Sequence, residues 1–200
     1  MRPFMYLREY ASMNSPPTAR HNRKAYDCLE SIIAGPSELH ETISRIAENL
    51  RTAYRLSQSI TVIVLLDGAK RFADDLFRIL QDPRFERHEI KVTSYQGTSS
   101  TGTVRIEREI GPVVTGRDVL IVDDIYDTGL TLFHTQAIIR SCGVKSLKTC
   151  VLFEKNRQHA YTVPVEFIGM KVPDRFLIGY GLDYNGQFRE LDCLGIFKDQ

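Results

Sequence analysis

The chain has 200 residues, of which 42% are apolar, so it is long enough for one sizeable core and is expected to form a single domain. Its basic and acidic residues nearly cancel at a net charge of +1, which argues against the broad basic surface of a nucleic-acid-binding protein. No stretch approaches the roughly 18 consecutive apolar residues of a membrane-spanning helix.

The four cysteines indicate neither a disulfide framework nor a zinc site. Cys28, Cys142, Cys150 and Cys193 lie far apart, form no Cys-x-x-Cys pair, and in three cases lie in or beside apolar runs. Reduced thiols of this kind are typical of cytosolic proteins, and the N-terminus lacks the apolar core of a secretory signal. We therefore expect a cytoplasmic protein whose partners are small molecules, with neither nucleic acid nor membrane among them.

Residues 1–26 are predicted to be a flexible N-terminal extension that precedes a single domain over residues 27–200. This segment contains five Lys or Arg residues but only one acidic residue, Glu9, together with serines and prolines. Such a composition is also similar to that of an organellar transit peptide, so this alternative stays open. We expect a frayed or loosely docked arm.

The first part of the chain predicts a strand, a helix and a second strand. Residues 29–33 form a possible short strand, Gly35-Pro36 breaks it, and Ser37 is expected to cap an amphipathic helix that packs on a sheet. Residues 60–66 read ITVIVLL, a β-branched run of the kind found in parallel strands that are covered on both faces. Asp67-Gly68 ends this run.

The later segments continue the alternation of helices and strands. Apolar residues at helical spacing between Phe72 and Leu80 predict a helix. The alternation of strands and helices predicts an open, mostly parallel α/β sheet. The remaining expected elements are strands over 89–95, 118–123, 147–153, 165–168 and 176–180, and a helix over about 129–141.

The polar stretch at residues 94–103 reads SYQGTSSTGT and is dense in glycine, serine and threonine. This composition is typical of a mobile connection between elements. In an α/β enzyme the same stretch can serve as a lid over the site. Both interpretations stay open on composition alone.

Three aspartates stand where the strand at 118–123 ends. Ligands of open α/β sheets bind beyond the carboxyl ends of the strands, which is where Asp123, Asp124 and Asp127 occur. The turn at 128–131 then leads into a helix, where main-chain amides, the positive helix end and two threonine hydroxyls favour a phosphate.

A phosphate-binding turn beside paired carboxylates suits a sugar phosphate. Asp123 and Asp124 would accept hydrogen bonds from ribose hydroxyls or help to hold Mg²⁺. The alternative is that the aspartates cap the turn and face water. The segment is neither a Walker A loop, because Gly-Lys-Ser/Thr is missing, nor a GxGxxG dinucleotide turn.

Four segments resemble those of a known family. VLIVDDIYDTGLTL, at 119–132, resembles the phosphoribosyl pyrophosphate signature of type I phosphoribosyltransferases. Within that family, three further segments are similar to the hypoxanthine-guanine phosphoribosyltransferases: SYQGTSSTG to their flexible loop, LFEKNR to their purine-recognising lysine segment, and VPDRFLIGYGLDYNGQFREL to their purine and pyrophosphate segment. The similarity runs in order from about residue 29 to 197.

The resemblance implies a fold and an activity. The fold is α/β, with a central, mostly parallel sheet flanked by helices and a small hood formed by N- and C-terminal segments. The implied purine salvage enzyme transfers the 5-phosphoribosyl group from phosphoribosyl pyrophosphate to N9 of hypoxanthine or guanine, giving IMP or GMP and pyrophosphate. The resemblance also implies Mg²⁺ as cofactor and a homodimer or homotetramer.

Two alternative functions remain. A xanthine-preferring or broad 6-oxopurine transferase stays open because main-chain groups mainly read the purine 2-position. A nucleic-acid-binding regulator with the same fold would need a basic face or an added helix-turn-helix. The chain has no spare segment of that length, and its Lys and Arg residues are dispersed.

The resemblance assigns the signature residues to the ribose phosphate. Asp123 and Asp124 would hold the ribose hydroxyls and contribute to metal binding. Asp127 would also act as the general acid/base near purine N7, where a carboxylate can take or share a proton. The residues implied for the 5′-phosphate are Asp127, Thr128, Gly129, Leu130 and Thr131.

The resemblance also assigns the groups that bind the purine. Lys155 would direct its ammonium to O6 and so select 6-oxopurines, because an amino group cannot accept that bond. Phe176 would stack on the ring, and main-chain groups of Leu177 and Asp183 would read its N1/N2 edge. The alternatives are that Lys155 is a solvated surface lysine and that Phe176 is a core residue.

Further residues are assigned to pyrophosphate and to closure of the site. The Asp183 carboxylate would orient a second Mg²⁺, and Arg189 would neutralise pyrophosphate; the alternative is an ordinary surface ion pair between the two. Ser94 and Tyr95 would travel with the loop that shuts out water.

One position departs from the family pattern. Main-chain amides of Asp67 and Gly68 are implied to meet pyrophosphate, yet many relatives carry Lys or Arg before this glycine. The Asp67 carboxylate repels an anion unless Mg²⁺ or Lys70 offsets it, so weaker pyrophosphate binding is a hypothesis. His159 likewise stands where relatives carry a basic residue, and no role is assigned to it.

Overall fold

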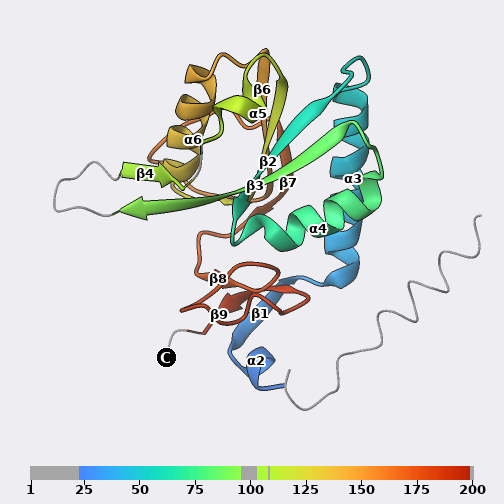
Figure 1. Ribbon diagram of the computed structural model, residues 1–200. Helices are drawn as coiled ribbons and strands as arrows, with labels where there is room; N and C mark the ends of the chain where they lie inside the picture. The colour runs from blue at the N-terminus through green and yellow to red at the C-terminus, as the bar shows by residue number, and fades with distance from the viewer. Residues whose placement is uncertain (1–22, 96–102, 108, 199–200) are drawn as a thin grey trace, which may run out of the picture.

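The computed structural model describes residues 23–95, 103–107 and 109–198, which form two sheets (Figure 1). The larger sheet has the order β4-β3-β2-β5-β6-β7, in which all neighbours are parallel except the antiparallel pair β3 and β4. Its strands are β2 (Ile60–Leu66), β3 (Phe85–Tyr95), β4 (Thr103–Ile106), β5 (Asp118–Tyr126), β6 (Ser146–Lys155) and β7 (Phe167–Val172).

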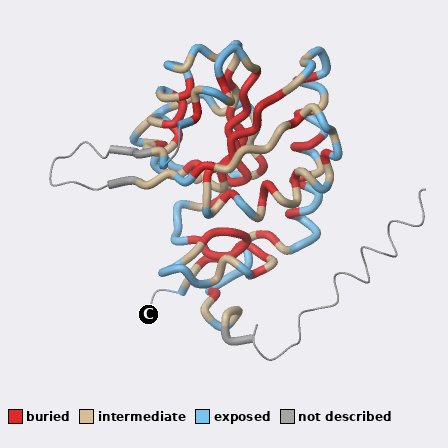
Figure 2. Tube along the Cα trace, in the orientation of Figure 1, coloured by how far each residue is buried: buried red, intermediate tan, exposed pale blue. Residues whose placement is uncertain are grey.

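Helices cover both faces of this sheet, as Figure 1 shows. Helices α3 (Pro36–Ala53) and α4 (Ala69–Leu80) share one core cluster with Val62 and Val64 of β2. Helices α5 (Gly111–Val114) and α6 (Leu130–Ser141) share a second cluster with Ile63 and Leu65. Alternate residues of β2 therefore enter different cores, which explains why every residue of the strand except Thr61 is apolar. The buried residues accordingly concentrate in the central strands (Figure 2).

The smaller sheet joins segments from opposite parts of the chain. Strand β9 (Leu194–Phe197) lies between β1 (Leu29–Ala34) and β8 (Leu177–Ile178) and is antiparallel to both. The short helix α2 (Arg23–Asp27) packs beside it, where the Tyr26 hydroxyl donates to the Asp192 carboxylate. The sheet corresponds to the expected hood.

The start of α3 differs from the expectation that Ser37 caps it. Gly35 is the N-cap residue, and its N–H donates to the Glu38 side chain with an N–Oε2 distance of 2.9 Å. Pro36 occupies the first turn, where its missing N–H costs nothing and its fixed φ suits a helix. The prediction of Ser37 as the cap was therefore wrong.

Several strand boundaries also differ. Strand β3 begins at Phe85 rather than at residue 89, because it pairs with β2 from Ile60 onwards. Strand β7 covers Phe167–Val172 rather than 165–168, and β8 is shorter than the expected 176–180. Helix α5 and strand β9 were not predicted, since both are short and depend on contacts with distant segments.

Two further observations concern the expected compartment and chain ends. None of the helices within the described ranges is long and apolar enough to cross a membrane. All four cysteines are free, and Cys150 and Cys193 are buried. Of the expected N-terminal extension, residues 1–22 lie outside the described part, as do residues 96–102 of the expected loop.

Candidate active site

A cavity of about 290 Å³ opens where β2 and β5 end. The turn between β5 and α6 contributes to its wall, and two residues of the segment after β8 contribute from the smaller sheet's side. The structure therefore brings together residues that are far apart in the sequence. The predicted site residues that line this cavity are Gly68, Asp123, Asp124, Asp127, Thr128, Gly129, Leu130, Thr131, Asp183 and Arg189.

The turn at the start of α6 is shaped by Gly129. This residue is the N-cap and has a φ of 86°, a conformation that costs glycine little. A Cβ atom here would lie 2.1 Å from the main-chain oxygen of Tyr161, so the site also excludes a side chain sterically. The first N–H groups of a helix lack intrahelical partners, and those of α6 begin at this cavity. An anion such as a phosphate can satisfy them.

Asp123 and Asp124 form a carboxylate pair at the end of β5. The Asp123 side chain is buried and accepts a hydrogen bond from the N–H of Asp124, with an N–Oδ1 distance of 3.0 Å. The Asp124 carboxylate lies against Gly68, where an added Cβ would come within 1.7 Å of Oδ2. Gly68 therefore makes room for the acid.

The surroundings of this pair disfavour negative charge. Burial, followed by repulsion from Asp124, raises the pKa of Asp123 well above its usual range. Burial also raises the pKa of Asp124, although the Arg189 guanidinium opposes this change. Ligand hydroxyl groups that donate to these carboxylates, or a cation that accompanies a ligand, would stabilise their negative charges.

Asp127 belongs to a cluster of four alternating charges. Its Oδ2 lies 2.9 Å from Lys155 Nζ, and its Oδ1 lies 3.4 Å from Arg157 Nη1. The same two cations lie 3.8 and 3.3 Å from Asp174 Oδ1. The Lys155 side chain is only 12% exposed, so it is an anchored group rather than a solvated surface lysine.

Arg157 and Asp174 were not predicted as site residues. Each lies inside a segment that carries the family resemblance, and their opposite charges offered a weak signal. Because they come from opposite ends of the segment 157–174, the sequence does not reveal that they meet. Their contacts hold the Asp127 and Lys155 side chains next to each other.

Asp183 and Arg189 form an ion pair that lines the cavity. Asp183 Oδ1 lies 2.6 Å from Arg189 Nη2, and Asp183 Oδ2 accepts from the N–H of Gly186 at 2.7 Å. Arg189 Nη1 also donates to the main-chain oxygen of Gly181 at 2.7 Å. The pair expected as a surface alternative therefore exists, but it faces the same cavity as Asp123 and Asp124.

Phe176 and Leu177 lie on the smaller sheet rather than in the lining of the cavity. The Phe176 ring is 47% exposed, and it contacts Tyr184 edge to face with 5.6 Å between ring centroids. It is therefore not a core residue, and one face is open to a ligand. Leu177 is buried in β8, where its main chain is held by pairing with β9.

The predicted pyrophosphate turn has an exposed carboxylate. The peptide bond between Leu66 and Asp67 is cis, and Asp67 is exposed outside the cavity lining. Lys70, which was expected to offset Asp67, instead lies 3.3 Å from Asp74 Oδ2 through its Nζ atom. The ammonium group that was expected to offset the charge of Asp67 is therefore already paired with Asp74.

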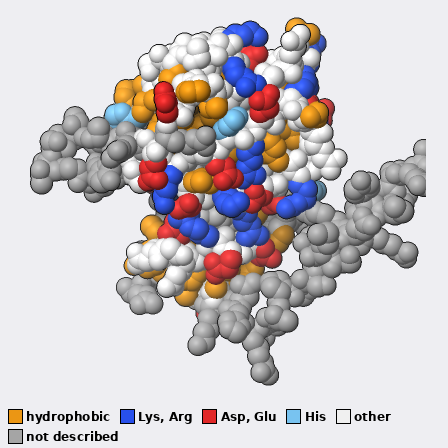
Figure 3. All heavy atoms as spheres, in the orientation of Figure 1, with side chains coloured by type: hydrophobic (Ala, Val, Ile, Leu, Met, Phe, Trp, Pro, Cys, Tyr) orange, Lys and Arg blue, Asp and Glu red, His pale blue; other side chains and the backbone are white. Residues whose placement is uncertain are grey.

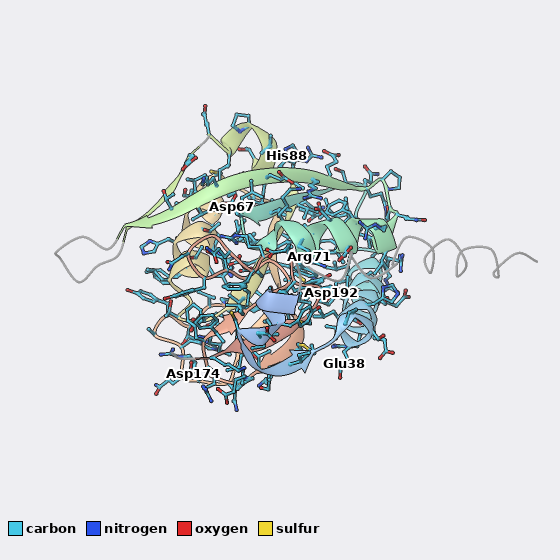
Figure 4. All side chains as sticks on the ribbon, turned by 90° about the horizontal axis from the view of Figure 1, so that it is seen from below. Glu38, Asp67, Arg71, His88, Asp174 and Asp192 are labelled. Carbon is cyan, nitrogen blue, oxygen red and sulfur yellow. The ribbon has the colours of Figure 1, made fainter. Side chains whose placement is uncertain are left out.

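Helix α4 is tied to the smaller sheet beside this turn. Arg71 Nη1 donates to the main-chain oxygens of Glu190 and Leu191, at 2.8 Å each. Figure 4 shows Asp67 and Arg71 near the start of α4. In Figure 3, acidic and basic side chains are mixed on the visible face rather than separated by sign. Local ion pairs, not one broad charged field, therefore set the electrostatics of this region.

The side chains fit a magnesium ion that is held in part by its ligand. Among the described residues, no group of three or more His, Cys, Asp or Glu side chains could hold a metal by itself. Asp123, Asp124 and Asp183 nevertheless line one cavity; Asp123 is buried and Asp124 half-buried, and a nearby cation would stabilise the charged form of both acids, whose pKa values are raised. Mg²⁺ commonly takes one or two carboxylates together with substrate oxygens and waters.

Comparison with known proteins identifies the family. Residues 35–185 match the phosphoribosyl transferase domain. The chain belongs to the phosphoribosyltransferase family. This phosphoribosyltransferase is 35% identical to the hypoxanthine-guanine-xanthine phosphoribosyltransferase of Tritrichomonas foetus, over 86% of its own length and 94% of the relative's. It is 33% identical to the hypoxanthine-guanine phosphoribosyltransferase of Bacillus subtilis, over 85% and 94% of the two chains.

A solved structure extends the similarity to three dimensions. The hypoxanthine phosphoribosyltransferase of Staphylococcus aureus matches with a TM-score of 0.82 at 29% identity, over 89% of this phosphoribosyltransferase and 96% of that chain. The predicted family and α/β fold class are thus confirmed. The roles of the individual site residues stay predictions.

We predict that Asp123→Asn raises the thermal stability of the ligand-free protein at pH 8. Because burial raises the pKa of Asp123, the folded state holds this proton more tightly than the unfolded chain does. The resulting penalty is absent below the unfolded pKa, about 4, grows as the pH rises from there to the raised folded pKa, and is constant above it. Asparagine carries no charge, and its side-chain oxygen can still accept the hydrogen bond from the N–H of Asp124.

The measurement is the unfolding temperature at pH 5 and pH 8, with EDTA and without phosphate. We expect a larger gain at pH 8, at about 2–4 °C for each kcal/mol relieved. Glu41→Gln, at an exposed position, is the control and should change little. An Asp123→Asn protein less stable than wild type at pH 8 would contradict the assignment.

Proposed function

We propose that this phosphoribosyltransferase salvages purines by transferring the 5-phosphoribosyl group from phosphoribosyl pyrophosphate to N9 of hypoxanthine or guanine, with IMP or GMP and pyrophosphate as products. The observation that carries the proposal is the meeting of three features in one place. These are the carboxylate pair, the turn at the start of α6, and Asp127, which lines the cavity and pairs with Lys155 outside the lining. The names of the relatives support the same substrates.

The signature segment binds the ribose phosphate. The first N–H groups of α6 and the hydroxyls of Thr128 and Thr131 receive the 5′-phosphate, while Asp123 and Asp124 accept from the ribose hydroxyls. This arrangement fixes the anomeric carbon in the cavity. Fixing the reacting atoms converts a bimolecular encounter into a step between held groups.

Lys155 and Asp127 recognise the base from adjacent positions. Lys155 Nζ donates to the purine O6, and the Asp127 carboxylate takes or shares a proton at N7. The 2.9 Å contact between these side chains supports their action on neighbouring atoms of one ring. Phe176 stacks on the purine, and main-chain groups of Leu177 and Asp183 read its N1/N2 edge.

Other groups bind the leaving pyrophosphate and keep water out of the site. Main-chain amides of Asp67 and Gly68 and the Arg189 guanidinium bind the departing pyrophosphate. Asp183, Asp123 and Asp124 would hold Mg²⁺, which would supply positive charge against the departing pyrophosphate. Ser94 and Tyr95 at the end of β3 begin the loop that excludes water from the oxocarbenium-like centre, although most of this loop lies outside the described residues.

A broad or xanthine-preferring 6-oxopurine transferase is the second candidate. The Tritrichomonas foetus relative is named for hypoxanthine, guanine and xanthine, and it is 35% identical to this chain. Main-chain reading of the purine 2-position does not separate the three bases through side-chain identity. Location and assembly are also proposals: a cytoplasmic enzyme, in keeping with its free cysteines, that forms a homodimer or homotetramer.

Steady-state kinetics on four bases test the proposed function. We expect kcat/KM for hypoxanthine or guanine to exceed that for adenine by about 10² or more, because adenine offers Lys155 no acceptor at position 6. Xanthine at or above the guanine value would establish the second candidate. Adenine as the best substrate would refute the role of Lys155.

Asp127→Asn tests proton transfer. The amide keeps the size of the side chain and cannot take a proton, so we expect kcat to fall by about 10² or more. Binding of phosphoribosyl pyrophosphate, measured by calorimetry, should change little because the main-chain amides remain. Undiminished turnover would remove the acid/base role.

The charge at position 67 sets the affinity for pyrophosphate. We expect Asp67→Lys to lower the pyrophosphate inhibition constant, since an attraction replaces a repulsion near the anion. Asp67→Asn, which only removes the charge, is the matched control and should give an intermediate value. A wild-type inhibition constant no higher than that of the lysine variant would disprove weakened pyrophosphate binding.

A further inference from the structure

His159 lies beside the turn that joins β5 to α6, here called the catalytic turn (residues 127–129), and packs against Tyr126 at the end of β5 and Asp127 of the turn. Its ring stacks on Tyr126, with 3.7 Å between ring centroids and 12° between planes. Its Nδ1 atom lies 2.5 Å from the main-chain oxygen of Asp127. The His159 side chain is only 13% exposed, so both contacts are shielded from water.

The contact with Asp127 fixes the position of one proton. A main-chain carbonyl oxygen can accept a hydrogen bond but cannot donate one. The Nδ1 atom of His159 therefore carries the hydrogen and is the donor. The Nε2 atom then faces Glu154, whose Oε1 lies 3.7 Å away.

The segment that follows His159 is attached to the same turn. The Tyr126 hydroxyl donates to the main-chain oxygen of Tyr161 at 3.0 Å and accepts from the N–H of Val163 at 3.2 Å. The N–H of Tyr161 donates to the main-chain oxygen of Thr128 at 2.9 Å. The back of the turn is thus bonded to the segment 159–163, while its front faces the cavity.

We propose that His159 is a positioning residue for the catalytic turn, acting through its hydrogen bond to the Asp127 carbonyl. A peptide unit is planar and, when trans, its C=O and the next N–H point in opposite directions. A hydrogen bond that draws the Asp127 carbonyl towards His159 therefore aims the Thr128 N–H the other way, and Thr128 lines the cavity. His159 would thereby orient both a phosphate donor and the backbone that carries the acid/base group.

This inference rests on the proposed function, because it assigns His159 to the same reaction. The inference goes beyond the proposed function because it gives a role to a side chain that lies outside the cavity lining. A packing role alone would require only the ring on Tyr126. The positioning role requires a donor at the place of Nδ1, so the two roles can be separated by substitution.

Two variants test the proposal, one that keeps the ring without the hydrogen-bond donor and one that keeps the donor without the ring. His159→Phe keeps a ring against Tyr126 and removes the donor, and we expect kcat/KM for phosphoribosyl pyrophosphate to fall by about 10–100-fold. His159→Asn loses the ring, but its amide N–H occupies the place of Nδ1–H and should recover most of that loss. Calorimetric titration with ribose 5-phosphate should show weaker binding to the Phe variant than to the Asn variant.

Each outcome decides the proposal. A Phe variant as active as wild type, or an Asn variant impaired as much as the Phe variant, would overturn it and leave His159 a packing residue. If His159→Phe does not fold, His159→Gln replaces it, because the glutamine amide reaches the place of Nε2 rather than Nδ1. Wild type without transferase activity would refute the proposed function, whereas the ribose 5-phosphate titrations would still judge the role of His159.

Discussion

The burial of two adjacent carboxylates at the end of β5 is the constraint on which the site depends. Burial raises the pKa of both Asp123 and Asp124, repulsion from Asp124 adds to this at Asp123, and the nearby Arg189 offsets part of it at Asp124. The surrounding sheet can bear that cost because β2 and β5 are covered on both faces by large apolar clusters. The destabilised pair is therefore a place where a polar ligand gains more than it would on the surface.

The sequence was informative wherever one segment alone determined the structure. Strand β2 and the helix that follows Gly129 were predicted nearly to the residue, and the start of β5 was also predicted, although β5 runs three residues beyond the expected end at 123. A continuous β-branched run of this length is typical of a strand buried on both faces. The turn at the start of α6 was recognisable as a candidate phosphate site for a related reason, since its amides, glycine and threonines are contiguous. The family resemblance added roles that local patterns do not contain.

The sequence was uninformative where the structure depends on distant partners. Strand β9 is a short apolar stretch that becomes a strand only between β1 and β8. The start of β3 is set by its register against β2. Arg157, Asp174 and His159 gain their significance from contacts with Asp127 and its neighbours, which are absent from the linear order. Local patterns predict elements, whereas these contacts are properties of the assembled fold.

The position of β9 in the middle of the smaller sheet has a consequence for biosynthesis. Both of its neighbours lie earlier in the chain, and Leu29 at the start of β1 is paired with Phe197. The larger sheet has all its strands by Val172, whereas the smaller sheet also needs β9, which ends at Phe197. The smaller sheet has to wait for β9 to leave the ribosome, and until then β1 lacks its partner. The smaller sheet, which supports Phe176, is accordingly completed after the larger sheet in a newborn chain.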